Sequence, residues 1–133
     1  PYRGQLRAVQ LVLAGKPLAS DDEFFSHKTD DRQYFEHLIE AAQGEYGADV
    51  DDVVMFNQRD EITETTVANI VIYHDGQWLT PPLHCGLLAG TFRQALLEQG
   101  VLVEQVITVD QLRAAEQIYL INSVRGWRWA QWH

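Results

Sequence analysis

Cysteine is almost absent from this sequence: Cys85 is the only one, so the chain cannot form an internal disulfide. A chain without disulfides fits a reducing compartment, and we therefore expect a cytoplasmic protein. Long apolar runs are absent too. None approaches the roughly 20 residues of a membrane-spanning helix and no secretory signal is visible, so no membrane partner is expected.

Basic residues are scarce. Ten Lys and Arg residues stand against 19 Asp and Glu residues, which gives a net charge of -9. A nucleic-acid binder needs a basic surface, so no nucleic-acid partner is expected. The acidic runs at residues 21–23 and 49–52 are expected to be solvated loops. The second run is not a calcium loop, because Val53 takes the next ligand position and the central glycine is absent. The histidines lack the spacing of metal ligands, so no metal site is expected.

Lysine is rare in this chain, with Lys16 and Lys28 as its only examples. Lys16 lies in a turn-like Gly-Lys-Pro tripeptide and is expected to be solvated. A lysine amine can form a Schiff base with pyridoxal phosphate, and a carboxylate can keep the pyridine nitrogen of that cofactor protonated. Lys28 and Glu64 are the candidates for these two roles. A single lysine is more often an ordinary surface residue, so the assignment depends on further motifs.

The 133 residues, 46% of them hydrophobic, suit one compact domain with a core. Apolar patterns predict strands over residues 6–13, 52–56, 68–73, 78–80, 102–108, 117–121 and 127–133. Helical spacing predicts helices over residues 30–43, 91–99 and 110–115, and Gly44 is expected to end the first of them. The Asp75-Gly76 pair predicts an antiparallel hairpin turn. The predicted fold class is therefore α+β, a mixed α/β domain.

A second motif, over residues 80–93, comprises a loop and the start of the second predicted helix. Gly90 lets the backbone approach a ligand closely, and the free amides of Thr91 and Phe92 at the helix N-terminus suit a phosphate group. Many helices begin with Gly-Thr, so this motif is weak when it is taken alone.

A third motif, over residues 119–126, ends a predicted strand. Asn122, Ser123 and Arg125 bring an amide, a hydroxyl and a guanidinium close together along the chain. Such groups can bind phosphate or carboxylate. A strand end followed by an ordinary turn explains the same residues equally well.

Taken in order, these motifs resemble the fold type IV pyridoxal phosphate enzymes. That family comprises branched-chain and D-amino acid aminotransferases and aminodeoxychorismate lyase. The strings His27-Lys28-Thr29 and Asn122-Ser123-Val124-Arg125-Gly126 are most similar to the lyase branch, which includes a lyase domain fused behind a para-aminobenzoate synthase component. The resemblance covers nearly the whole chain.

The resemblance implies a role for each candidate residue. Lys28 becomes the Schiff-base lysine and proton shuttle, and Glu64 the partner of the pyridine nitrogen. The backbone amides of Thr91 and Phe92, with the hydroxyl of Ser123, become ligands of the cofactor phosphate. The cofactor implied is pyridoxal 5'-phosphate.

Asn122 and Arg125 become candidates for binding substrate carboxylates. The sequence departs from the family pattern at two places. Ala89 stands where a proline is usual, which is expected to affect loop stiffness. Thr91-Phe92 replaces the usual Ile-Thr pair, so a threonine hydroxyl is lost while both amides remain. We therefore expect weaker phosphate binding.

The resemblance also implies an architecture, the D-amino acid aminotransferase-like fold with a mixed sheet or partial barrel and packed helices. Residues 1–133 would be the larger C-terminal lobe, and the N-terminal lobe, which normally supplies an arginine to the phosphate, would be absent. The site of such enzymes lies between lobes near a dimer interface, so we expect a homodimer and a fragment that is inactive alone. The tryptophans Trp127, Trp129 and Trp132 suggest a surface that the missing lobe or a partner subunit covers.

The implied function is a lyase of the folate pathway that converts 4-amino-4-deoxychorismate to 4-aminobenzoate and pyruvate. Lys28 and Glu64 would serve equally in a branched-chain or D-amino acid aminotransferase, so this alternative stays open. A third alternative is a non-catalytic structural or assembly domain that has lost the cofactor. In the first two cases the partner is a small-molecule substrate.

Overall fold

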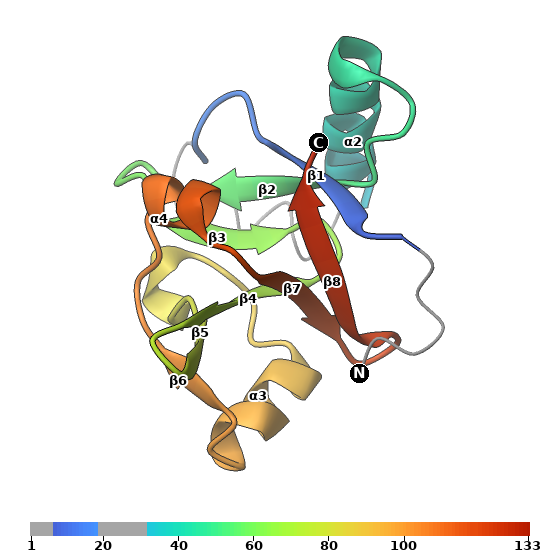
Figure 1. The fold of residues 1–133 in the computed structure, drawn as a ribbon. Coiled ribbons are helices and arrows are strands. Elements are labelled where there is room, and N and C mark those ends of the chain that lie inside the picture. The colour runs from blue at the N-terminus through green and yellow to red at the C-terminus, as the bar shows by residue number, and fades with distance from the viewer. Residues whose placement is uncertain (1–6, 19–31) are drawn as a thin grey trace.

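The computed structural model describes residues 7–18 and 32–133. Strands in these residues form a single sheet in the order β3-β2-β1-β8-β7-β4-β5-β6 (Figure 1). The strands are β1 (Val9–Leu13), β2 (Asp52–Phe56), β3 (Ile62–Thr65), β4 (Asn69–His74), β5 (Gln77–Thr80), β6 (Leu102–Glu104), β7 (Ile118–Asn122) and β8 (Gly126–Trp132). The helices are α2 (Arg32–Tyr46), α3 (Thr91–Glu98) and α4 (Val109–Ala114), with a 3-10 turn at Leu83–Cys85.

The sheet is mixed and curled. Strand β1 runs parallel to β2 and β8, and β5 runs parallel to β6, whereas the other neighbouring pairs are antiparallel. Its two edges approach each other, because the Ile62 N–H donates to the Ile107 carbonyl at 2.8 Å and Glu61 forms a bridge with Thr108. These contacts join the β3 edge to the segment after β6. The predicted α+β fold class and the partial barrel are confirmed.

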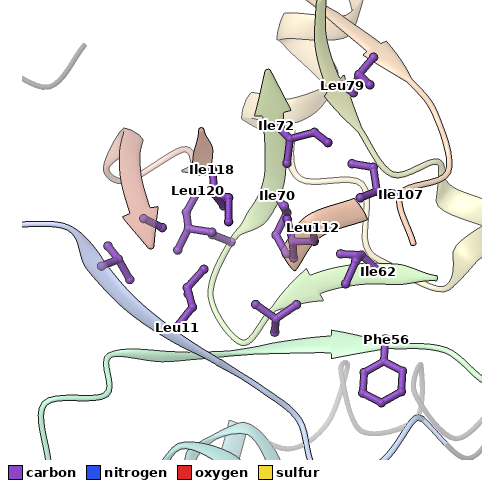
Figure 2. Close-up of a cluster of buried hydrophobic side chains, with 14 residues drawn as sticks. Leu11, Phe56, Ile62, Ile70, Ile72, Leu79, Ile107, Leu112, Ile118 and Leu120 are labelled. Carbon is purple, nitrogen blue, oxygen red and sulfur yellow. The ribbon is translucent and has the colours of Figure 1, made fainter. Parts of the chain in front are cut away.

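The main core fills the inside of this curl. Leu11, Ile62, Ile70, Leu112 and Leu120 are at most 1% exposed and come from four strands and α4. Figure 2 shows their side chains gathered between strands that are distant in the sequence. Burying such side chains contributes about 1.5–3 kcal/mol each. This core fixes the relative positions of the strand ends, where the candidate site residues lie.

Helix α2 packs on the outer side of β1 and β2 through Ala42, which contacts the buried cluster of Val12, Val50 and Val53. The helix continues past Gly44 to Tyr46, so the prediction that Gly44 ends it is wrong. Gly47 follows the helix with a φ of 124°, a conformation that glycine adopts more easily than other residues. The chain therefore leaves the helix at the second of two nearby glycines.

Two further predictions concern the length of β6 and the hairpin between β4 and β5. Strand β6 ends at Glu104 and does not reach residue 108, because residues 107 and 108 turn to meet the β3 edge. The hairpin between β4 and β5 has the predicted left-handed turn, with a φ of 50° at Asp75 and 77° at Gly76. In the described part of the chain, no helix is long and apolar enough to cross a membrane.

The expected tryptophan surface is largely packed within the chain. The Trp127 ring lies 5.3 Å from the Trp78 ring in an edge-on contact. The Trp132 indole N–H donates to the Leu112 carbonyl, and the Arg113 guanidinium lies 5.0 Å from the Trp132 ring centre. Of the three tryptophans only Trp129 is among the exposed large apolar residues.

The burial of Asp52 contradicts a further prediction. The acidic run at residues 49–52 was expected to be solvated, yet the Asp52 side chain is only 2% exposed. It begins β2, where its carboxylate accepts hydrogen bonds from Thr66, next to β3. The burial comes from a tertiary contact with a strand edge, which the local sequence does not encode.

Candidate functional site

A pocket of about 190 Å³ brings together five of the residues predicted from the sequence. It lies where β3 and β7 end and where β4 and α3 begin. The predicted residues on its wall are Glu64, Thr91, Phe92, Asn122 and Ser123. They come from three separate stretches of sequence, so the curl of the sheet is what places them together.

A larger pocket of about 510 Å³ lies elsewhere and contains none of the predicted residues. It is lined by Tyr73 and His74 at the end of β4, whereas the smaller pocket is lined by Asn69 at the beginning of that strand. Its polar lining residues, such as Gln105 and Gln117, are exposed. The smaller pocket is therefore the better candidate, because its Glu64, Asn69 and Arg93 side chains are buried and lie in strands or a helix.

Glu64 is the buried acid of the site, with 3% of its surface exposed. It lies in a β-bulge: between the pairs Val54–Thr65 and Phe56–Ile62, β3 contains one residue more than β2. Bulges commonly turn a side chain toward a functional site. A carboxylate buried to this degree favours a positive charge beside it, so Glu64 suits a protonated ring nitrogen.

The N-terminus of α3 supplies the anion-binding part of the site. Gly90 is the N-cap and provides no side-chain hydrogen bond, and Thr91 and Phe92 line the pocket. The first amides of a helix have no acceptor within the helix, and the helix dipole favours an anion at this end. A phosphate is therefore well suited to this position.

Gly90 also allows a close approach of two chain segments. A Cβ atom at this position would lie 2.4 Å from Asn69 Oδ1, which is shorter than any normal contact. Asn69 is 5% exposed, and its side-chain amide donates to the Leu88 carbonyl at 3.2 Å. Asn69 thus holds the loop that precedes α3 in place, a role that the sequence motifs had not assigned.

The turn after β7 forms the opposite wall. The Asn122 side-chain oxygen accepts from the amides of Val124 and Arg125, and its amide donates to the Val67 carbonyl at 3.2 Å. Asn122 therefore ties the β7 turn to the turn after Glu64. Ser123 is exposed and lines the pocket, whereas Arg125 is exposed and does not line it.

Lys28 lies outside the described residues, so its role stays a prediction. Arg93 also lines the pocket, and no sequence motif assigns it a role. It is 1% exposed, and its Nη2 atom donates to the Pro81 carbonyl at 3.1 Å and to the Glu104 carboxylate. Arg93 therefore fixes α3 against β5 and β6, next to the proposed phosphate position.

The donor set fits a phosphate-bearing pyridine cofactor. It combines a buried carboxylate, a helix N-terminus and a hydroxyl, and glycine at position 90 lets Asn69 pack against the start of the helix. Among the described residues, no group of three or more His, Cys, Asp or Glu side chains could hold a metal ion. The arrangement can bind an anion at one end and a ring cation at the other.

Comparison with known proteins gives a consistent picture. The sequence model of the family described as amino-transferase class IV matches residues 10–131. Over 77 residues, 56% of this chain and 33% of the relative, the chain is 42% identical to a Schizosaccharomyces pombe protein with the provisional name aminodeoxychorismate lyase. Over 127 residues, 92% of this chain and 46% of the relative, it is 29% identical to the aminodeoxychorismate lyase of Vibrio harveyi.

The comparison with solved structures agrees with the sequence comparison. The crystal structure of a provisionally named amino-acid aminotransferase from Mesorhizobium loti has a TM-score of 0.77 and 32% identity, and the alignment covers 96% of this chain and 60% of that chain. The chain therefore spans less than two thirds of the length of each of these relatives.

Proposed function

Since the chain belongs to the amino-transferase class IV family of pyridoxal phosphate enzymes, we propose that the intact protein is an aminodeoxychorismate lyase. It converts 4-amino-4-deoxychorismate to 4-aminobenzoate and pyruvate, and the atoms of the substrate are fully accounted for in these two products. The observation that supports this proposal most strongly is the meeting of Glu64, the α3 N-terminus and Ser123 in one pocket. The names of the two relatives favour the lyase over other reactions of the family.

The bound cofactor supplies an electron sink that stabilises negative charge at the substrate α-carbon. Glu64 keeps its ring nitrogen protonated, and the amides of Thr91 and Phe92, with the Ser123 hydroxyl, hold its phosphate. Lys28 would hold the cofactor covalently in the resting enzyme and, once the substrate amine has displaced it, would remove the proton from the substrate α-carbon. Cleavage of the C–O bond to the enolpyruvyl group would leave an aromatic ring, which favours the reaction, and the departing enolpyruvate would take up one proton to become pyruvate.

The covalent chain supports the role of Lys28. Only three residues separate it from Arg32, so the Cα atoms of Lys28 and Arg32 can be at most about 14 Å apart. The Arg32 guanidinium donates to the Thr66 carbonyl at 3.1 Å, and Val67, the next residue, lines the pocket. The length of chain between Lys28 and Arg32 is thus compatible with the proposed role of Lys28.

A labelling experiment tests the enzyme proposal. The full-length protein is incubated with pyridoxal phosphate and reduced with borohydride, and the modified peptide is mapped by mass spectrometry. We expect one pyridoxyl group on Lys28, its loss in K28A and its retention in K16A. An unlabelled protein, or a label on another residue, would exclude the proposed role of Lys28 and favour a non-catalytic domain.

An aminotransferase is the second candidate, because the M. loti protein, which is 32% identical, is named as an amino-acid aminotransferase. The two reactions have different products. The lyase releases pyruvate from 4-amino-4-deoxychorismate without an amino acceptor, whereas a branched-chain or D-amino acid aminotransferase needs an amino donor and 2-oxoglutarate. Coupled assays for pyruvate and for glutamate on the same preparation distinguish them.

We propose a second, N-terminal lobe in the intact protein, a homodimer, and a cytoplasmic location. The lobe is supported by the incomplete coverage of the relatives. Light scattering of the full-length protein tests the dimer, and a monomer at micromolar concentration that retains activity would contradict it.

A further inference from the structure

We propose that Asp52 is a positioning residue for Glu64 and that it acts through Thr66. The inference rests on the role proposed above for Glu64 and adds to it the group that fixes this acid in place. None of the sequence motifs includes Asp52, and it does not line the pocket.

The contacts between Asp52 and Thr66 are short and completely buried. Asp52 Oδ1 accepts from the Thr66 hydroxyl at 2.6 Å and from the Thr66 backbone amide at 3.2 Å. It also accepts from the Val53 amide at 2.8 Å, which orients the carboxylate on its own strand. Hydrogen bonds to a buried carboxylate are about twice as strong as those between neutral groups. Asp52 therefore holds both the side chain and the backbone of Thr66.

The strand that carries Glu64 needs such a contact. Between Ile62 and Thr65 the pairing of β3 with β2 is irregular, because β3 contains an extra residue there. A regular ladder of backbone hydrogen bonds therefore does not fix Glu64 from both sides. The Asp52–Thr66 contact anchors the chain two residues after Glu64, immediately beyond the bulge.

A second group holds Thr66 from another direction. The Arg32 guanidinium donates to the Thr66 carbonyl at 3.1 Å. Thr66 is thus bound at its amide, its hydroxyl and its carbonyl, and it is 0% exposed. A single residue fixed at three polar groups restricts the turn between β3 and β4, and Val67 and Ala68 of this turn line the pocket.

A contribution to stability does not by itself explain why a buried aspartate lies at position 52. Asp52 Oδ2 is buried, and no hydrogen-bond partner for it occurs among the described residues. Removing a carboxylate oxygen from water without a partner is unfavourable. Because the burial of Asp52 is unfavourable, its presence beside this turn is best explained by its effect on the position of Glu64. Small displacements of a catalytic group lower the rate strongly.

The test compares T66V, which removes the hydroxyl, with T66S, which keeps it, in the full-length protein loaded with pyridoxal phosphate. T63V is the matched control, because Thr63 is also 0% exposed and its hydroxyl has no hydrogen-bond partner among the described residues. The first readout is the nitrogen-15 chemical shift of cofactor labelled at the ring nitrogen, which reports protonation of the group beside Glu64. The second is the effect on kcat and KM separately.

We expect T66V to lower the protonated fraction of the ring nitrogen and to reduce kcat about 10-fold, with KM changed less than about twofold. T66S and T63V should match the wild type in both readouts. If T66V fails to fold, D52N carries the test, since its neutral amide weakens the same hydrogen bonds; we expect changes of the same sign and smaller size.

The failures of the two proposals are distinguishable. A wild-type protein that gives no pyridoxyl label on Lys28 contradicts the proposed function itself. A labelled wild type in which T66V, or D52N where T66V does not fold, has the same ring protonation and kcat as T63V overturns the role of Asp52. A T66V variant that loses stability and cofactor affinity but keeps ring protonation also overturns it, because that result indicates a structural role only.

Discussion

Position 90 requires glycine because Asn69, from a distant part of the sequence, packs closely against it. In G90A the new Cβ atom would lie 2.4 Å from Asn69 Oδ1, so the Asn69 side chain or the loop must move. Because Asn69 also holds the Leu88 carbonyl, we expect the α3 N-terminus to shift away from its phosphate position. The affinity for pyridoxal phosphate should fall about 10-fold or more, which corresponds to about 1.4 kcal/mol.

Fluorescence titration of the full-length protein measures this affinity. G15A is the control, because a Cβ atom at Gly15 would meet nothing within 4 Å. Equal cofactor affinity in G90A and G15A would show that the phosphate is not held by this helix.

Asp52 predicts a pH dependence of stability. Burial raises the pKa of its carboxyl above the ordinary value of 3.8, against the opposing hydrogen bonds from Thr66 and its neighbours. A raised pKa means that the folded state binds the proton more tightly than the unfolded state. The stabilising contribution is therefore full below the ordinary pKa and is lost as pH rises through the pKa of the folded state.

The substitution D52N removes this titration. We expect the unfolding free energy of D52N, relative to the wild type, to improve as pH rises above about 3.8 and to become constant above the pKa of the folded state. Urea denaturation between about pH 3 and pH 8 measures the difference. A difference that is independent of pH, or one that changes in the opposite direction, would contradict the assignment.

At the scale of elements, the end of α2 has two nearby glycines with opposite requirements, one inside the helix and one just after it. Gly44 lies inside the helix, and a Cβ atom there would meet nothing within 4 Å. We expect G44A to increase the unfolding free energy by about 0.5–1 kcal/mol, because alanine loses less backbone entropy in a helix. G47A should be destabilising, since its φ of 124° is unfavourable for alanine and its Cβ would approach Asp49 at 2.9 Å.

Thermal and urea unfolding of the two variants give these changes. A stabilising G47A or a destabilising G44A would place the helix end at Gly44, as the local sequence suggested.

The same helix illustrates what local sequence can provide. Apolar spacing predicted most elements to within a few residues, and β2 was predicted at the bounds observed. The end of α2 and the length of β6 were not predictable, because each depends on a tertiary contact. Gly44 is compatible with a helix once its apolar face packs on β1 and β2, and β6 is shortened by the turn of residues 107 and 108 toward β3.

The site was predictable to a similar extent. Glu64, Thr91 and Ser123 each lie in a recognisable motif, and the resemblance supplied the expectation that these motifs meet. Asp52 and Asn69 act through hydrogen bonds to residues far away in the sequence or in another loop. No local pattern distinguishes a buried aspartate in an acidic run from its solvated neighbours, so Asp52 could be found only from the structure.

At the scale of the whole molecule, the closure of the partial barrel makes a prediction for hydrogen exchange. Ile62 lies on the edge strand β3, where amides usually exchange quickly. Its amide donates to the Ile107 carbonyl at 2.8 Å, and the side chain is fully buried. We therefore expect the Ile62 amide to be protected like the amides of central strands.

Native-state exchange followed by NMR measures this protection. The Gly76 amide in the exposed hairpin turn serves as the reference for fast exchange. An Ile62 amide that exchanges as fast as that of Gly76 would indicate an open sheet in solution.

The parallel pair of β1 and β8 has a consequence for how the chain acquires its structure. Val9 pairs with Ala130, so two strands that lie side by side are far apart in the sequence. During synthesis on a ribosome, β1 can pair early with β2, but its other edge has no partner until β8 emerges. Contacts of such long sequence separation slow folding. We therefore expect the nascent chain to carry an unpaired, aggregation-prone strand edge until β8 has emerged.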